Sequence, residues 1–200
     1  MTCRRLARFL IVLTFTLPAL GCPPDRPVCA PTAPYRLPPR RSDAGPCTSH
    51  QIALFRHAEK GATKGPDDRD PDLSPRGHDR AARISKLLAR ALITRLIASD
   101  AKRTQQTLAP LADRLGKPVD VVPGARTEEL VRELRDAPPG SFTVVASHSN
   151  VVPLVVTALG GAPLRDLGPD GSLGEDDYGR MFLMTVGCSE APVIVEITSD

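Results

Sequence analysis

The chain has 200 residues, of which 41% are hydrophobic and 4% aromatic, and its formal net charge is +3. Because a domain usually has about 100–200 residues, this length suits one domain with additional segments. The charge is uneven: residues 1–47 hold seven Arg and two Asp, a net of +5, whereas residues 48–200 carry a net of −2. A near-neutral folded part with few aromatic side chains argues against nucleic-acid binding.

The first 21 residues have the features of an export signal. Three arginines lie within the first eight residues, an apolar run covers residues 9–20, and Gly21 follows it. A basic start, a short apolar stretch and a small residue are typical of a signal peptide. The run is shorter than the roughly 20 apolar residues that a membrane span needs. We therefore predict a signal peptide over residues 1–21.

The sequence LPALGC, residues 17–22, resembles a bacterial lipobox, in which the cysteine is lipidated and becomes the mature N-terminus. We predict lipidation of Cys22, which would anchor the exported protein in the membrane of the bacterial cell envelope, on its periplasmic or surface side. Ordinary signal cleavage, which would release an unanchored protein, is the alternative.

Residues 22–47 are predicted to be a linker. Eight prolines occur among residues 22–46, without apolar periodicity, and such a composition forms an extended tether. If Cys22 carries lipid, the thiols of Cys29, Cys47 and Cys188 can form one disulfide at most, with a pairing that stays open. The sequence has no Cys-x-x-Cys pair, which argues against a structural zinc site.

Residues 48–200 begin with a strand at 51–55 and a helix that Ser74 caps, with Pro75 in its first turn. The apolar face predicted for this helix consists of Ile84, Leu87, Leu88, Ala91 and Leu92. A second strand at 93–98 precedes a helix that Ser99 or Asp100 caps and Gly116 ends.

The second half continues the same alternation. A short strand at 119–122 precedes a helix from a Thr127 cap to about residue 135. A strand at 142–146 then leads into a buried helix at 151–159, and residues 180–186 and 192–198 form an antiparallel pair. This order predicts an α/β fold: a three-layer sandwich with a mainly parallel central sheet.

Polar side chains follow the ends of three predicted strands. They are Arg56 and His57 after the first strand, Arg103 one turn into the helix after the second, and His148, Ser149 and Asn150 after the fourth. Ligands bind beyond the carboxyl ends of parallel strands. Arginine forks and helix N-termini both bind phosphate. These residues are therefore predicted to form one phosphate site, whereas His50 and His78 are interpreted as satisfied core or surface residues.

Four segments resemble motifs of the histidine phosphatase superfamily, which includes the phosphoglycerate mutases. They are RHAEK (56–60), LSPRGHDRA (73–81), SDAKRTQQT (99–107) and ASHSN (146–150). The resemblance implies a phosphoglycerate mutase-like fold. Ala58 departs from the motif, because the family has glycine after the histidine.

The resemblance also implies a mechanism. His57 would attack a phosphomonoester, or a similar phosphoryl group, and form a phosphohistidine that water hydrolyses. Arg56, Arg103 and His148 would bind the phosphoryl oxygens. The family's general acid lies roughly two dozen residues after the second-motif arginine, which suits Glu128; Glu129 and Glu59 are alternatives. This mechanism needs no metal ion and no cofactor.

The predicted function is therefore a metal-independent phosphoric monoester hydrolase of the histidine acid phosphatase type, acting on a small phosphorylated substrate. A mutase is less favoured, because only 16 residues separate His57 from Ser74 and leave little chain for a lid. The alternative is a non-catalytic envelope lipoprotein that retains the fold and binds phosphate or a partner.

Overall fold

The computed structural model describes residues 48–65, 68–187 and 191–199. The predicted signal peptide and linker, the lipidation of Cys22, and the cysteines at 29, 47 and 188 lie outside the described residues. These features stay predictions.

The described residues form a six-stranded sheet in the order β3-β2-β4-β1-β5-β6. Its strands are β1 (His50–Arg56), β2 (Arg95–Ala98), β3 (Val119–Val121), β4 (Phe142–Ser147), β5 (Arg180–Val186) and β6 (Val193–Thr198). The first four run parallel, and β5 and β6 add an antiparallel edge. The strands predicted from the sequence are confirmed to within two residues at each end.

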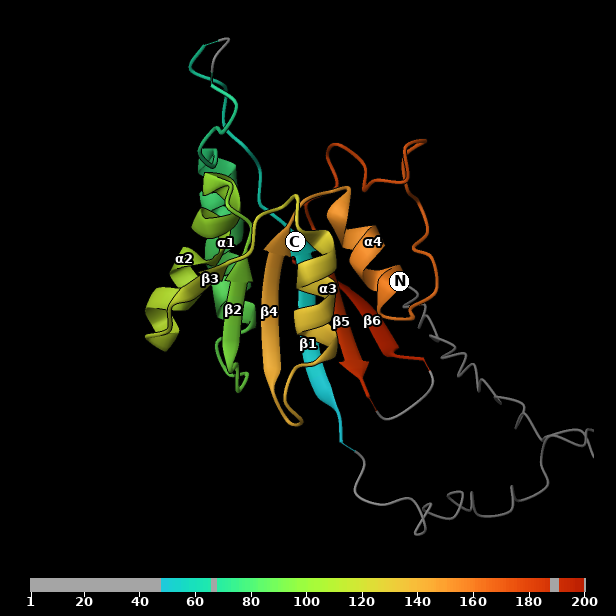
Figure 1. Ribbon diagram of the computed structural model, residues 1–200. Helices are drawn as coiled ribbons and strands as arrows, with labels where there is room; N and C mark the ends of the chain where they lie inside the picture. Colours follow the sequence, from blue (N-terminus) through green and yellow to red (C-terminus); the bar gives the residue numbers. More distant parts are fainter. Residues whose placement is uncertain (1–47, 66–67, 188–190, 200) are drawn as a thin grey trace, which may run out of the picture. The chain divides into compact units, whose positions relative to one another are not determined.

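Two helices cover each face of the sheet (Figure 1). They are α1 (Pro75–Leu87) and α2 (Lys102–Leu115) on one face, and α3 (Thr127–Arg135) and α4 (Val151–Ala158) on the other. The predicted three-layer α/β fold is confirmed. None of the helices in the described part of the chain is long and apolar enough to cross a membrane.

Strand β1 is buried on both of its faces and delivers the residues that follow it to a fixed point. Ile52 and Leu54 pack into the core beneath α3 and α4, and Ala53 and Phe55 pack into the core beneath α1 and α2. All four are at most 1% exposed. Because burying one large apolar side chain contributes about 1.5–3 kcal/mol, this strand holds Arg56 in place firmly.

Helix α1 begins as predicted. The Ser74 hydroxyl accepts from the Gly77 amide at 3.1 Å, and Pro75 occupies the first turn. A methyl group added at Gly77 would lie 2.2 Å from the Glu59 carbonyl oxygen, so the helix rests directly on the backbone just after His57. Only glycine allows this approach.

The apolar face predicted for this helix is wrong at two positions. Leu87 is 50% exposed and Leu92 is 90% exposed, whereas Ile84 and Leu88 are buried. The helix ends at Leu87. The apolar residues keep their three- and four-residue spacing as far as Leu92, so this spacing extends beyond the end of the helix.

The predicted caps of the next two helices are also wrong. Ala101, not Ser99 or Asp100, precedes α2, and Arg126, not Thr127, precedes α3. Gly116 ends α2 in the left-handed conformation, φ 61°, as predicted.

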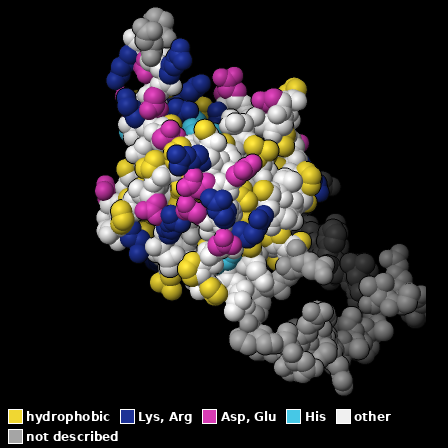
Figure 2. Space-filling model, in the orientation of Figure 1, with side chains coloured by type: hydrophobic (Ala, Val, Ile, Leu, Met, Phe, Trp, Pro, Cys, Tyr) yellow, Lys and Arg dark blue, Asp and Glu magenta, His cyan; other side chains and the backbone are white. Residues whose placement is uncertain are grey.

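On the face seen in Figure 2, basic and acidic side chains are interspersed without a large block of one sign.

Candidate active site

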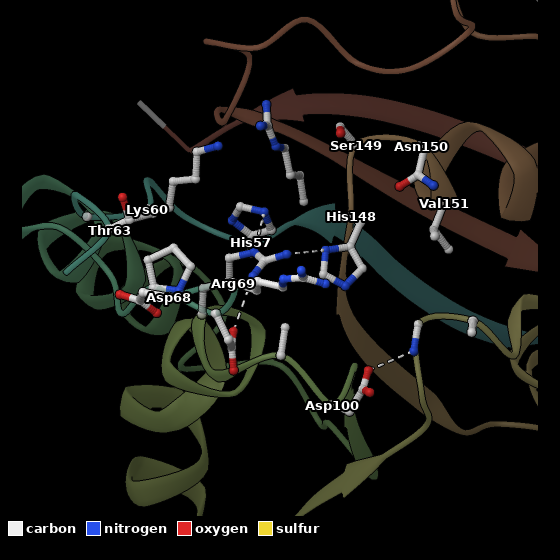
Figure 3. A pocket seen from close by; sticks show the side chains of 18 residues that line it. His57, Lys60, Thr63, Asp68, Arg69, Asp100, His148, Ser149, Asn150 and Val151 are labelled. Carbon is white, nitrogen blue, oxygen red and sulfur yellow. Dashed lines mark hydrogen bonds and ion pairs between the residues drawn. The ribbon is translucent and has the colours of Figure 1, made fainter. Parts of the chain in front are cut away.

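The carboxyl ends of β1, β2 and β4 lie at the same edge of the sheet, because these strands are parallel and β4 lies between the other two. The His57 amide donates to the Ser147 carbonyl at 2.9 Å, which joins the two histidine-bearing loops. A cavity of about 810 Å³ opens there (Figure 3). Its lining includes all six residues predicted to bind phosphate or react: Arg56, His57, Arg103, His148, Ser149 and Asn150.

The His57 ring is held in one tautomer. Its Nδ1 lies 2.7 Å from the Ala58 carbonyl oxygen and must donate to it. Its Nε2 accepts from Nε of Arg103 at 3.1 Å, since a guanidinium can only donate. Burial lowers the pKa of His57 to about 3, and the positive charges of Arg103 and Arg56 add to this effect. The ring is therefore neutral at physiological pH, with its lone pair at Nε2.

His148 faces the same guanidinium. Its Nδ1 lies 3.4 Å from Nη2 of Arg103 and accepts from it, so its Nε2 donates to the Ser99 hydroxyl at 2.8 Å. The Ser99 hydroxyl in turn lies 2.8 Å from the Thr104 hydroxyl. Burial is the largest cause that lowers the pKa of His148. The two imidazole rings meet edge to face, with centroids 5.6 Å apart.

Arg56 lines the same cavity as His57. Its Nη1 donates to the carbonyl oxygens of Gly174 and Glu175, both at 2.7 Å, and its guanidinium lies 4.0 Å from the centroid of the Tyr178 ring. Its Nε is buried and has no hydrogen-bond partner among the described residues. Such an unpaired buried donor costs about 1–3 kcal/mol.

The N-terminus of α4 offers fewer free backbone amides for binding an anion than the sequence predicted. The amides of Val151 and Val152 both donate to the His148 carbonyl oxygen and are not free to bind an anion. Ser149 and Asn150 still line the cavity. Their side chains and any remaining free amides are the part of this helix start that a ligand can reach.

The structure corrects the predicted general acid. Glu128 and Glu129 line a neighbouring groove between α3 and α4, not the cavity that contains the histidines. The Glu59 carboxylate accepts from the Arg80 guanidinium, whose nitrogens lie 2.9–3.1 Å away, and forms an ion pair with Arg76 at 3.1 Å. Burial opposes ionisation of Glu59, but the bonds from Arg80 outweigh it and hold the pKa of the carboxyl below its ordinary value.

Three acidic residues that were not predicted line the cavity: Asp68, Asp70 and Asp100. Asp70, in the loop between β1 and α1, lies 3.2 Å from Nη1 of Arg103. Asp100 accepts from the Gly124 amide at 2.9 Å, and this bond holds the pKa of its carboxyl below the ordinary value. A methyl group added at Gly124 would lie 3.1 Å from the His148 ring. None of these acids carried a sequence signal, because loop carboxylates follow no period.

Alanine stands at position 58, where the resembled motif has glycine, without a conflict. The Ala58 side chain is fully buried, and its amide donates to the Thr107 hydroxyl at 3.0 Å. That hydroxyl donates to the Arg103 carbonyl at 2.6 Å. Thr107 thus connects the loop after His57 to the helix that carries Arg103.

The other two histidines lie away from the site. His78 is exposed, as predicted. His50 is 5% exposed and its Nε2 has no partner among the described residues, so the interpretation of a satisfied core histidine is wrong. Within the described ranges, no group of three or more His, Cys, Asp or Glu residues is placed to hold a metal ion.

Residues 52–126 match the model of the histidine phosphatase superfamily, branch 1. This segment contains Arg56, His57 and Arg103, and His148 lies beyond it. A comparison with curated proteins gives no significant match.

Solved structures share the fold at low sequence identity. A mycobacterial glucosyl-3-phosphoglycerate phosphatase is 15% identical, with a TM-score of 0.55 over 76% of this chain and 100% of that chain. A protein described as mycobacterial hydrolase 1 is 17% identical, with a TM-score of 0.56 over 76% and 99%. The protein histidine phosphatase SixA, solved with tungstate, is 19% identical, with a TM-score of 0.55 over 74% and 97%. These likenesses confirm the phosphoglycerate mutase-like fold.

Proposed function

We propose that the protein is a phosphatase that hydrolyses a small phosphomonoester, or a similar phosphoryl compound, through a phosphohistidine at His57. One observation carries this proposal: the unprotonated Nε2 of a buried, neutral His57 accepts from Arg103 in a cavity that Arg56 and His148 also line. An unprotonated nucleophile and nearby cationic donors for anionic oxygens are the two parts that phosphoryl transfer requires.

In the first step, a phosphoryl oxygen replaces Nε2 of His57 as the acceptor for Nε of Arg103. The lone pair on Nε2 then attacks phosphorus, and the bond from phosphorus to the leaving oxygen breaks. The imidazole becomes positively charged, and the Ala58 carbonyl that accepts from Nδ1 stabilises that charge. Arg103 and Arg56 donate to the equatorial oxygens of the transferring group. Their guanidiniums supply the positive charge that the transition state needs, so the mechanism uses no metal ion or cofactor.

In the second step, water attacks the phosphohistidine, the bond from phosphorus to nitrogen breaks, and inorganic phosphate leaves. The lone pair returns to Nε2. His148 lines the same cavity, and it would bind a phosphoryl oxygen through a proton on Nδ1, with its Nε2 then accepting from the Ser99 hydroxyl. Positioning of this kind supplies most of the catalysis in phosphoryl transfer.

The leaving oxygen needs a proton unless it is a weak base. None of the three candidate glutamates lines the cavity, and two of its aspartates bind other groups: Asp70 accepts from Arg103, and Asp100 accepts from the Gly124 amide. We therefore propose that substrates with good leaving groups, such as aryl phosphates or phosphoramidates, are hydrolysed faster than alkyl phosphates. One structural neighbour is named a glucosyl-3-phosphoglycerate phosphatase and another a protein histidine phosphatase, which is consistent with either class.

The test is a panel of phosphomonoesters and phosphoramidates offered to the purified full-length protein, with His57→Ala as the control. The proposal predicts release of phosphate that the variant lacks. If the protein binds tungstate saturably but releases no phosphate from any member of the panel, it is a non-catalytic phosphate-binding protein instead.

We also propose that the protein acts in the bacterial envelope, anchored through Cys22. The sequence of residues 1–47 is the support for this proposal. Mass spectrometry of the mature N-terminus after expression in a bacterium would show a lipidated Cys22. In cell fractionation, the Cys22→Ala variant would no longer be found with the membranes. A mature N-terminus without lipid would indicate ordinary signal cleavage.

A further inference from the structure

We infer that Asp70 is a positioning residue, which holds the Arg103 guanidinium in the orientation that lets it contact both histidines. The inference rests on the proposed function, because it assigns a role within the same site. Asp70 belongs to the loop between β1 and α1, and Arg103 lies on α2, 33 residues further along the chain.

Three sides of the Arg103 guanidinium are occupied in the structure. Its Nε donates to Nε2 of His57 at 3.1 Å, and its Nη2 donates to Nδ1 of His148 at 3.4 Å. Its Nη1, on the opposite side, donates to Oδ1 of Asp70 at 3.2 Å. Because the guanidinium is planar and rigid, fixing Nη1 fixes the direction of the edge formed by Nε and Nη2.

The same carboxylate also fixes the start of the helix that carries Arg103. Both oxygens of Asp70 lie 3.1 Å from the amide of Lys102, the first residue of α2. The residue that precedes the helix, Ala101, has no side chain that could cap it. A carboxylate at a helix N-terminus accepts from a free amide and interacts favourably with the helix dipole. Asp70 therefore determines the position of both the backbone and the side chain of Arg103.

A carboxylate in a cavity for an anion would otherwise be unfavourable. By charge alone, Asp70 opposes the binding of phosphate, and its removal would strengthen binding. By position, it aligns the donors that phosphate contacts, and its removal would weaken binding and slow turnover. The two roles predict changes of opposite sign, so one substitution distinguishes them.

The experiment compares Asp70→Asn, Asp70→Ala and Asp70→Glu with the wild-type full-length protein. Asp70→Asn retains an oxygen that can accept from Lys102 and so keeps the helix cap. Asp72→Asn is the matched control: it neutralises a carboxylate of the same loop that binds Lys64 and Gln106. Calorimetric titration with tungstate gives the affinity for an oxyanion. Turnover is measured with p-nitrophenyl phosphate and with an alkyl phosphate.

We expect Asp70→Ala to lower kcat by about 10²-fold for both substrates, because misplacement of a positioning group by about 1 Å has an effect of that size. Asp70→Asn should weaken tungstate binding by about tenfold, Asp70→Glu should recover part of kcat, and Asp72→Asn should stay within about twofold of wild type.

Three results would overturn the inference. Tighter or unchanged tungstate binding by Asp70→Asn with unchanged kcat would show that Asp70 only adjusts the charge. A loss of kcat confined to the alkyl phosphate would show that Asp70 is the general acid. An equal loss in Asp72→Asn would show a general effect of the loop. If the wild type binds tungstate without turnover, the proposed function fails, and the change in tungstate affinity alone decides the role of Asp70.

Discussion

Replacement of His57 by glutamine tests the electrostatic state of the proposed nucleophile without any assay of activity. In the native state the pKa of His57 is about 3, against an ordinary value of 6.5. Below about pH 6.5 the unfolded chain therefore takes up a proton at this position that the folded chain excludes. The contribution to stability is fully present above pH 6.5 and is lost as the pH falls toward 3. Glutamine does not titrate, so the variant lacks this loss.

The size of the effect follows from the linkage between proton binding and unfolding. One excluded proton lowers the free energy of unfolding by about 1.4 kcal/mol per pH unit, which gives about 2 kcal/mol between pH 7.5 and pH 5. The full interval down to pH 3 corresponds to a loss on the order of 5 kcal/mol. His148 and the paired carboxylates also lose stability in acid, but they do so in both proteins and cancel in the comparison.

The assay is urea unfolding in phosphate-free buffer at about pH 7.5, 6 and 5, for wild type, His57→Gln and the control His78→Gln. His78 is exposed, so its variant should follow wild type. We expect the wild-type protein to lose about 2 kcal/mol more than His57→Gln over this interval. Parallel losses in the two proteins would refute the inference that burial keeps His57 neutral.

Four further predictions concern the rest of the site. Arg103→Lys should lower kcat by about 10²–10³-fold in steady-state assays, because one ammonium cannot contact both histidines as the guanidinium does; unchanged kcat would contradict this. Gly124→Ala places a methyl group 3.1 Å from the His148 ring and should lower kcat about tenfold with little change in melting temperature. Gly77→Ala forces a methyl group against Glu59 and should lower the free energy of unfolding by about 1–3 kcal/mol in urea titrations. Dialysis against a chelator should leave kcat unchanged, since the guanidiniums supply the cationic charge; a loss that added metal restores would contradict the mechanism.

The fold was largely predictable, because its signals are local. Alternating apolar runs and helical periodicity define the elements, and Ser74 caps α1 three residues from the amide that it binds. The order of the strands was not predictable in this way. Strand β4 inserts between β1 and β2, and no short segment of sequence specifies that pairing. The residue that caps α2 could not be predicted for the same reason: Asp70 lies 32 residues before Lys102, whose amide donates to it.

In the site, too, some features could be predicted from the sequence and others could not. Arg56, His57, Arg103 and His148 follow the carboxyl ends of parallel strands, and parallel strands necessarily bring those ends to one edge. The direction of Glu128 depends instead on how the loop before α3 turns. Spacing along the chain carries no information on that turn, and the side chain lies over a different groove.

The most direct measurement is a rapid quench of the wild-type protein with a radiolabelled phosphomonoester, followed by mapping of any labelled peptide. If His57 is the nucleophile, we expect a base-stable, acid-labile adduct on His57. This adduct should form faster than the steady-state rate and should be missing in His57→Ala. Turnover without a labelled histidine, or a label on another residue, would contradict the claim that His57 is the nucleophile.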